Sequence, residues 1–339
     1  MNHFEPSIER AQECRLAMDE LLWDSVRDLL ADAGEDVPDP AASDGTGAPT
    51  GMLDYAAYFD LSLPVDDSSA RPNVDADAAR AYLRKRLAGL PPLTAPATPA
   101  PISNLSGEYF TDDEIDRMHR WWDIEPANRM SMVPADPDEF ARLNEQVPVA
   151  MDYLRLASEE LHGEIETIIR DIVLTKPDGK TNRINYSGAS SFALWGALTI
   201  NAETQREWMQ SYRQIVHETG HNLLFGIARD EPLVSDDPAE RMPSAIRADP
   251  RPADGVFHAA YVSAREALAF DLLLTKHDET GCLPGDDPQI LEDMLELSVL
   301  AFWDCVETLR STAKLTGLGD RVLADCEAYM TENFAIEPV

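Results

Sequence analysis

A change in hydrophobic periodicity between residues 171 and 226 is the feature that most constrains how this chain can fold. Residues 171–202 (DIVLTKPDGKTNRINYSGASSFALWGALTINA) hold two or three β-rich runs around a Pro-Asp-Gly-Lys turn. Helical spacing begins in the next segment, ETQREWMQSYRQIVHETGHNLLFG, and Gly226 marks its expected end. This order predicts a small sheet packed beside a long helix.

The remainder of the chain is helical in pattern. Apolar residues recur at helical spacing in four ranges: 6–32, 76–88, 137–170 and 288 to near the C-terminus. Pro148 is the expected break within the third range, because proline lacks the N–H of an interior helical residue. We therefore predict a mainly α fold with a small β-sheet packed beside the motif-bearing helix, a helix-rich α+β architecture.

Two further local signals suggest a division of the chain. Five prolines in residues 91–101 predict an extended connector, and Thr111 with Glu114 forms a capping-box pattern that starts a helix. We expect an N-terminal helical region with proline-rich connectors at 1–150 and a domain that carries the motif at 151–339.

The charge of the chain limits its partners. It has 28 basic and 62 acidic residues, a formal net charge of −34. Such a chain repels polyphosphates and anionic membrane surfaces, so neither nucleic acid nor a membrane is an expected partner. The N-terminal residues MNHFEPSIERAQECR lack the features of a secretory signal, and the four cysteines form no C-x-x-C pair. These features predict a soluble cytoplasmic protein with reduced thiols.

His217, Glu218 and His221 form an H-E-x-x-H motif within the helical segment. Residues four apart lie on one face of a helix, so both imidazoles can bind the same ion. Two imidazoles leave most of a metal's coordination sphere open, and a third protein ligand is expected. The alternative, a pair of histidines that binds nothing, is disfavoured by the strand-then-helix setting and the apolar neighbours.

His258 is the expected third ligand. It opens an apolar helix in DGVFHAAYVSAREALAF, where Tyr261 and Arg265 follow at i+3 and i+7. A buried core histidine with a local hydrogen bond remains an alternative. Glu266 lies about 80° around that helix from His258, so both side chains cannot easily point at one ion. The carboxylate candidates for the same position are Glu231, Glu240 and Glu266.

A zinc peptidase is the alternative function of this motif. The metzincin extension needs a glycine at position 224 and a histidine at 227, where this chain has Leu224 and Ile227. A gluzincin would use a glutamate on a later helix, and Glu266 could serve, although its surroundings do not match E-x-x-x-D. Hydrolysis would require Glu218 as general base for a zinc-bound water.

The segment RMPSAIRADPRPADGVFHAAYV at 241–262 resembles the αKG-HExxH-type peptide β-hydroxylases, which use Fe(II) and 2-oxoglutarate in ribosomal peptide natural-product pathways. The upstream pieces SGASSFALWGALTIN and IVHETGHNLLF match as well. The resemblance covers roughly residues 165–275, and the N-terminal 150 residues contribute nothing to it. The matching residues of the segment are Ser244, Arg247, Asp249, Pro250, Arg251, Pro252, Gly255, His258, Tyr261 and Val262.

The resemblance implies an oxygenase that binds a ferrous ion, chelates 2-oxoglutarate and leaves one position for O2. The metal ligands would be His217, His221 and His258, which departs from the usual two histidines and one carboxylate. Glu218 would then orient a ligand or a water molecule and would not act as a hydrolytic base.

The resemblance also implies a binding site for 2-oxoglutarate. Arg247 or Arg251 would hold the distal carboxylate through a bidentate guanidinium, with Ser244 and Tyr261 as auxiliary donors. Surface salt bridging is the alternative role of the two arginines.

The expected function is hydroxylation of the β-carbon of a residue in a peptide, such as a ribosomal precursor peptide. A zinc peptidase is the second possibility. A metal-binding remnant that acts only as a recognition partner, through its N-terminal helical region, is the third.

Overall fold

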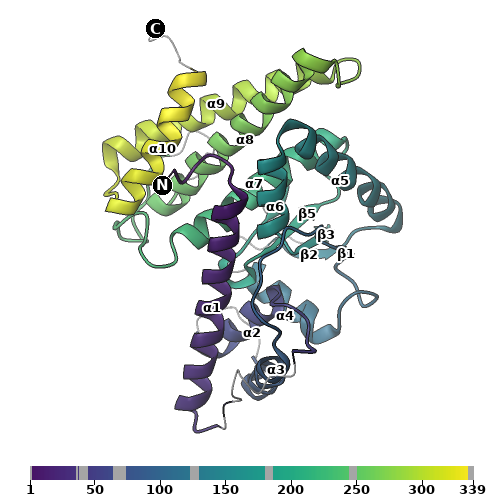
Figure 1. Cartoon of the computed structure of the whole chain (residues 1–339), viewed down its shortest axis with the longest axis vertical. Coiled ribbons are helices and arrows are strands. Elements are labelled where there is room, and N and C mark those ends of the chain that lie inside the picture. Colours follow the sequence, from purple (N-terminus) through teal and green to yellow (C-terminus); the bar gives the residue numbers. More distant parts are fainter. Residues whose placement is uncertain are drawn as a thin grey trace.

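The computed structural model confirms the helix-rich α+β architecture (Figure 1). Its described part forms ten α-helices and a five-stranded mixed sheet. The residues described are 2–35, 37, 45–63, 74–122, 130–179, 186–243 and 250–334.

The N-terminal helices are α1 (Ile8–Asp32), α2 (Met52–Ser62), α3 (Ala76–Gly89) and α4 (Asp112–Trp122). Helices α1, α3 and α4 agree with the sequence predictions, whereas α2 was not predicted. Residues 91–101 contain no helix or strand, as expected of a proline-rich connector. The predicted capping box starts α4, because the Thr111 amide donates to Glu114 Oε2 at 2.9 Å and the Glu114 amide donates to Thr111 Oγ1 at 3.4 Å.

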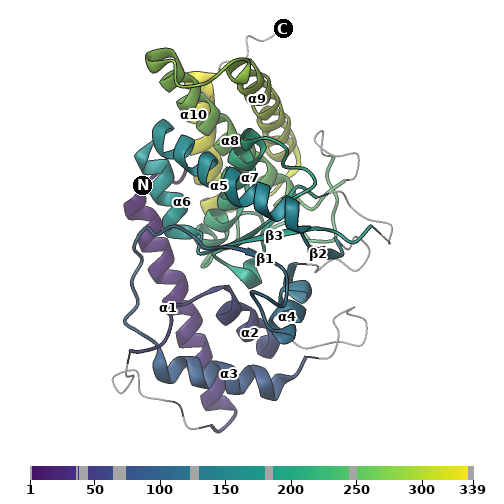
Figure 2. The same cartoon turned by 90° about the vertical axis from the view of Figure 1, so that its right-hand side faces the viewer.

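The sheet lies at the centre of the molecule, with α2 to α4 on one side and α5 to α7 on the other (Figure 2). Its strands are β1 (Ile102–Asn104), β2 (Met132–Pro134), β3 (Asp171–Pro177), β4 (Gly188–Ala189) and β5 (Ala197–Asn201). The order is β1-β3-β5-β4, in which β1, β3 and β5 are parallel and β4 is an antiparallel edge strand; β2 pairs antiparallel with the end of β3. Every residue of β5 is buried, as expected where both faces of a strand are covered.

The predicted break at Pro148 is wrong. Helix α5 (Pro137–Ala157) runs through Pro148, and α6 (Glu159–Ile168) begins only after Ser158. Ser158 has extended backbone (φ −162°, ψ 123°), and its hydroxyl accepts from the Leu161 amide at 3.2 Å. Helix α5 therefore ends at the extended backbone of Ser158, whose hydroxyl caps the start of α6. At Pro148 the helix continues although one backbone hydrogen bond is missing there. Residue 150, the suggested boundary, lies inside α5.

The C-terminal half is a stack of long helices. They are α7 (Trp208–Ile227), α8 (Ala253–Thr280), α9 (Asp287–Thr312) and α10 (Gly317–Asn333). Helix α7 crosses α8 closely at Gly220, where an added Cβ would lie 3.1 Å from the Val262 side chain. This close approach brings the motif face of α7 to the helix that carries His258.

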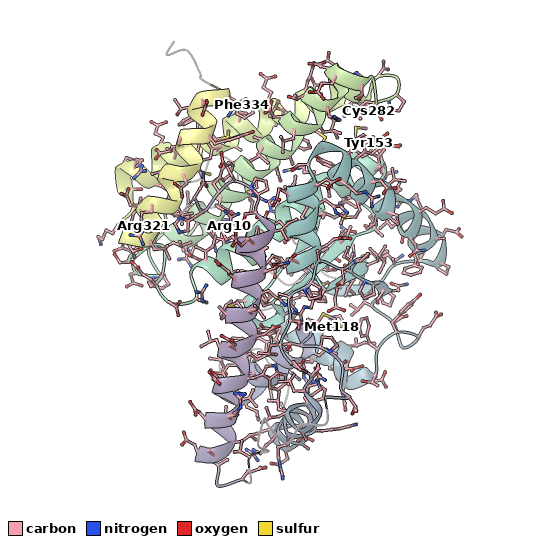
Figure 3. All side chains as sticks on the ribbon, viewed as in Figure 1. Arg10, Met118, Tyr153, Cys282, Arg321 and Phe334 are labelled. Carbon is pink, nitrogen blue, oxygen red and sulfur yellow. The ribbon has the colours of Figure 1, made fainter. Side chains whose placement is uncertain are left out.

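A buried ion cluster ties the N-terminus to this stack. Glu164 on α6 pairs with Arg10 on α1 at 2.7 Å and with Arg265 on α8, and the carboxylate is fully buried. Arg10, labelled in Figure 3, lies at the end of α1 that meets the C-terminal helices. Removing one partner of such a cluster leaves a buried charge unpaired, so the contacts fix α1, α6 and α8 relative to one another.

The other expectations concern the membrane and the cysteines. Within the described residues, no helix has the length and apolar character that crossing a bilayer requires. Cys14, Cys282, Cys305 and Cys326 are all free thiols.

Candidate metal centre

Asn222 fixes the orientation of α7 on the sheet. Its side-chain oxygen accepts from the Gly196 amide at 2.8 Å, and its side-chain nitrogen donates to the Ala197 carbonyl at 3.2 Å. Trp195 Nε1 donates to the Asn222 carbonyl at 2.8 Å, and all these groups are buried. Because one face of α7 is pinned to the start of β5, His217 and His221 project from another face toward α8 and α9.

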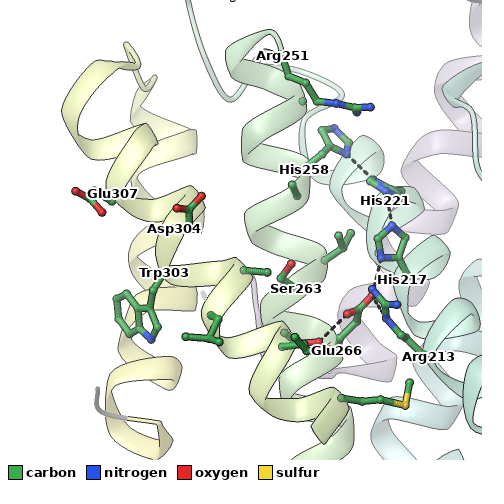
Figure 4. A pocket seen from close by; sticks show the side chains of 18 residues that line it. Arg213, His217, His221, Arg251, His258, Ser263, Glu266, Trp303, Asp304 and Glu307 are labelled. Carbon is green, nitrogen blue, oxygen red and sulfur yellow. Dashed lines mark hydrogen bonds and ion pairs between the residues drawn. The ribbon is translucent and has the colours of Figure 1, made fainter. Parts of the chain in front are cut away.

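The structure brings the three predicted metal-binding histidines together in a row (Figure 4). His217 Nε2 and His221 Nε2 lie 3.2 Å apart. His258 contacts the opposite side of the second ring, with His221 Nδ1 and His258 Nδ1 2.8 Å apart. The rings of His221 and His258 are stacked at a centroid distance of 5.1 Å.

Glu266 orients the first histidine. Its Oε1 lies 2.7 Å from His217 Nδ1 and accepts from Arg213 Nε at 3.0 Å, while its Oε2 accepts from the Ser298 hydroxyl at 2.8 Å. Burial alone would raise the pKa of Glu266, but the hydrogen bond from His217 and the charge of Arg213 outweigh it and lower that pKa to about 2. An ionised Glu266 accepts the Nδ1–H of His217, which leaves the Nε2 lone pair available.

The pKa values of the outer two histidines move in opposite directions. Burial lowers the pKa of His217, but the hydrogen bond and negative charge of Glu266 outweigh it, and the net shift is upward. For His258 burial dominates and lowers the pKa, although the Asp254 carboxylate, 4.0 Å from His258 Nε2, acts in the opposite direction. A neutral His258 is the form that can accept a hydrogen bond from His221 Nδ1–H.

Two of the three histidines fit one metal ion as they are placed. Ligand nitrogens on an ion with bonds of about 2.0–2.1 Å lie about 2.9–3.4 Å apart, and the two Nε2 atoms of His217 and His221 are separated by 3.2 Å. His258 faces the other nitrogen of His221 and is placed to hold that ring. No group of three histidine, cysteine or acidic side chains within the described residues is arranged to hold an ion. His258 as third ligand therefore stays a prediction.

The histidines line a cavity of about 780 Å³ between α7, α8 and α9. Arg213 and Arg251 also line it, at opposite ends of the histidine row (Figure 4). Arg251 is held at the start of α8 by two backbone hydrogen bonds with Met242, of 2.9 and 2.6 Å. Arg213 and Arg251 place two guanidinium groups beside the histidine row, whereas Asp304 and Glu307 line the α9 side of the same cavity.

Arg213 was not predicted from the sequence. It precedes His217 by four residues, as His217 precedes His221, so helical spacing places all three on one face. Helical spacing counted back from His217 indicates Arg213, although the H-E-x-x-H motif itself begins at His217. Ser298, from α9, carried no sequence signal.

The other predicted 2-oxoglutarate ligands have different outcomes. Ser244 and Arg247 lie outside the described residues. Tyr261 is buried away from the cavity: its hydroxyl donates to the His3 carbonyl at 3.1 Å, and its ring meets Phe4 edge-on at 6.2 Å. Tyr261 follows His258 by three residues on α8, but its side of the helix packs against the N-terminal residues His3 and Phe4 and not against the cavity.

Glu218 lies on the sheet side of α7. Its side chain is 2% exposed and does not line the cavity that holds the histidines. Gln214 Nε2 donates to Glu218 Oε1 at 2.7 Å, and both residues are close to strand β4. Burial raises the pKa of Glu218, although the charge of His217 and hydrogen bonds from Ser190 and Gln214 act against that shift.

Comparison of the chain with protein-family models and with curated proteins finds no match.

Proposed function

We propose that the protein is an Fe(II)- and 2-oxoglutarate-dependent oxygenase that hydroxylates the β-carbon of a residue in a peptide. One observation carries the proposal. The cavity combines a histidine pair spaced for one ion with two arginines, Arg213 and Arg251, while Glu218 lies outside it.

His217 and His221 would hold the ferrous ion through their Nε2 atoms. When bound, iron with 2-oxoglutarate and O2 supplies the oxidising chemistry that removes hydrogen from an unactivated carbon. Glu266 fixes the ring of His217, and His258 fixes the ring of His221, so neither ligand has to be ordered when the ion arrives. As placed, His258 would act on the ion through His221, and its role as third ligand stays a prediction from the sequence.

The arginines match the charge of the co-substrate. 2-Oxoglutarate is a dianion, and a chain with a net charge of −34 would repel it in the absence of local basic groups such as Arg213 and Arg251. Arg213 uses Nε to bind Glu266, while its side chain is half exposed toward the cavity. A guanidinium can bind a carboxylate through two parallel hydrogen bonds, and either arginine can serve in this way.

The zinc-peptidase alternative depends on Glu218. A general base must come within about 2.6–3.2 Å of the proton that it removes, directly or through one water. Glu218 is buried beside Gln214 and does not share a surface with the cavity. The contacts of Glu218 suit a structural role between α7 and β4.

An oxygen-free titration tests the proposal. Adding Fe(II) and then 2-oxoglutarate to the protein should produce a visible charge-transfer band, which Arg213→Ala or Arg251→Ala should weaken or shift to higher co-substrate concentration. Arg321→Ala, which changes an exposed residue of α10 outside the cavity lining, is the matched control and should leave the band unchanged. Absence of the band, together with zinc-dependent peptide cleavage that Glu218→Gln abolishes, would establish the peptidase instead.

A further inference from the structure

The two most exposed large hydrophobic side chains of the described residues lie on one helix. Leu297 and Leu300 of α9 are 67% and 52% exposed, and both line the cavity that holds the histidines. Exposed leucines scattered singly need no explanation, but two on the rim of a candidate active site form a contiguous apolar surface. With Met294 and Ala301 they form one stripe of α9, which we call the α9 rim.

Negative charge lies at the other end of the same stripe. Glu307 lines the cavity two turns beyond Leu300, and no described basic side chain pairs with its carboxylate. Asp304 lines the cavity between them (Figure 4). The face of α9 that lines the cavity therefore carries the apolar α9 rim and, further along the helix, the carboxylates of Asp304 and Glu307.

The occupant of this surface must be complementary in charge. A second copy of the chain also carries −34 and would be repelled, which disfavours self-association through an acidic face. A cationic peptide would be attracted to Glu307 while its apolar side chain covers the leucines. The rim adjoins the histidines, so a peptide held there lies beside the reactive centre.

We propose that the α9 rim binds the peptide substrate, and that this substrate carries an apolar residue about three to five positions from a lysine or arginine. The spacing follows from geometry. At about 1.5 Å per residue of helix, Leu300 and Leu297 lie about 10 and 15 Å from Glu307 along α9, which an extended peptide spans in about three to five residues. The inference rests on the proposed function, because it names the substrate class of that same site.

Binding of synthetic peptides tests this without iron or 2-oxoglutarate. The probe is a fluorescein-labelled nonapeptide of glycine and serine with one leucine and one lysine four positions away, measured by anisotropy in EDTA at low salt. It should bind at least tenfold more tightly than versions in which glutamate replaces the lysine or serine replaces the leucine. Leu297→Ser and Leu300→Ser should each weaken binding about tenfold, as expected when a leucine contact is lost.

Matched variants separate the rim from the rest of α9. Glu307→Gln should weaken binding of the lysine peptide about threefold and leave the peptide without lysine unaffected. Ile290→Ser and Glu292→Gln, on α9 but outside the cavity lining, should leave affinity unchanged. Equal loss in Ile290→Ser and Leu300→Ser, or equal binding of the lysine and glutamate peptides, would overturn the proposal.

Two further outcomes are decisive. A dimer in sedimentation that Leu300→Ser dissociates would assign the rim to a second copy and overturn the peptide site. Specific peptide binding without 2-oxoglutarate turnover would leave the rim in place and refute only the oxygenase, whereas succinate formation without peptide binding would refute only the rim.

Discussion

Replacing Glu266 by glutamine should weaken metal binding without removing a ligand. The carboxylate holds His217 Nδ1 at 2.7 Å, Arg213 Nε at 3.0 Å and the Ser298 hydroxyl at 2.8 Å, and it is 2% exposed. Glutamine keeps the size of the side chain but loses the charge that makes these hydrogen bonds strong. With an amide, the tautomer and orientation of His217 are no longer fixed before the ion arrives.

The expected loss is 10- to 100-fold in affinity, or about 1.4–2.8 kcal/mol, which is the range seen when a partner that orients a metal-bound histidine is removed. Isothermal titration with Fe(II) under anaerobic conditions, or with Co(II) as a surrogate, measures it directly. Ser298→Ala removes one neutral donor to Glu266 and should weaken affinity less than threefold. Glu218→Gln, which contacts no histidine nitrogen, should also remain within threefold. Wild-type affinity in Glu266→Gln, or an equal loss in Glu218→Gln, would refute the assignment of Glu266 as the residue that positions His217.

Three further predictions concern the third ligand, the helix crossing and a buried acid. His258→Ala should abolish tight iron binding as His217→Ala and His221→Ala do; a loss of only about 10- to 100-fold would mean that His258 orients His221 and is not a ligand. Gly220→Val should lower the free energy of unfolding by about 1–3 kcal/mol in urea, because a Cβ added there would lie 3.1 Å from the Val262 side chain. Gly255→Ala should change it far less, because a Cβ added at that position would have ordinary contacts of 3.7 Å or more. Burial raises the pKa of Asp171 from 3.8 to about 6, so the folded state binds the proton more tightly than the unfolded state. The free energy of unfolding should therefore fall by up to about 3 kcal/mol as the pH rises from about 4 to about 6. Asp171→Asn should flatten that part of the urea-unfolding profile, and an unchanged slope would contradict the assignment.

The sequence predicted the elements that local rules control. Helical periodicity located α1, α3 and the C-terminal helices, and the capping box at Thr111 gave the start of α4. The same rules failed at Pro148, because packing of the long helix α5 outweighs the destabilising effect of a proline inside it. The turn comes instead at Ser158, which caps the start of α6. Local signals predict where a helix can end, and tertiary packing decides where it does end.

The candidate site was predicted only in part, for a similar reason. Helical spacing brought His217 and His221 to one face and could also have included Arg213. It could not reveal that Tyr261 turns toward Phe4, because that contact depends on an N-terminal segment more than 250 residues away in the chain. The role of Glu266 as a hydrogen-bond partner of His217 likewise depends on how α7 and α8 cross.

Oxygen-isotope labelling of the product tests the central claim most directly. The protein is loaded anaerobically with Fe(II) and 2-oxoglutarate and exposed to ¹⁸O2, and succinate is then analysed by mass spectrometry. The oxygenase predicts succinate that carries one ¹⁸O atom, formed by the wild-type protein and lost in His217→Ala and His221→Ala. Absence of labelled succinate from the iron-loaded wild-type protein, with casein cleavage by the zinc-loaded protein that Glu218→Gln abolishes, would contradict it.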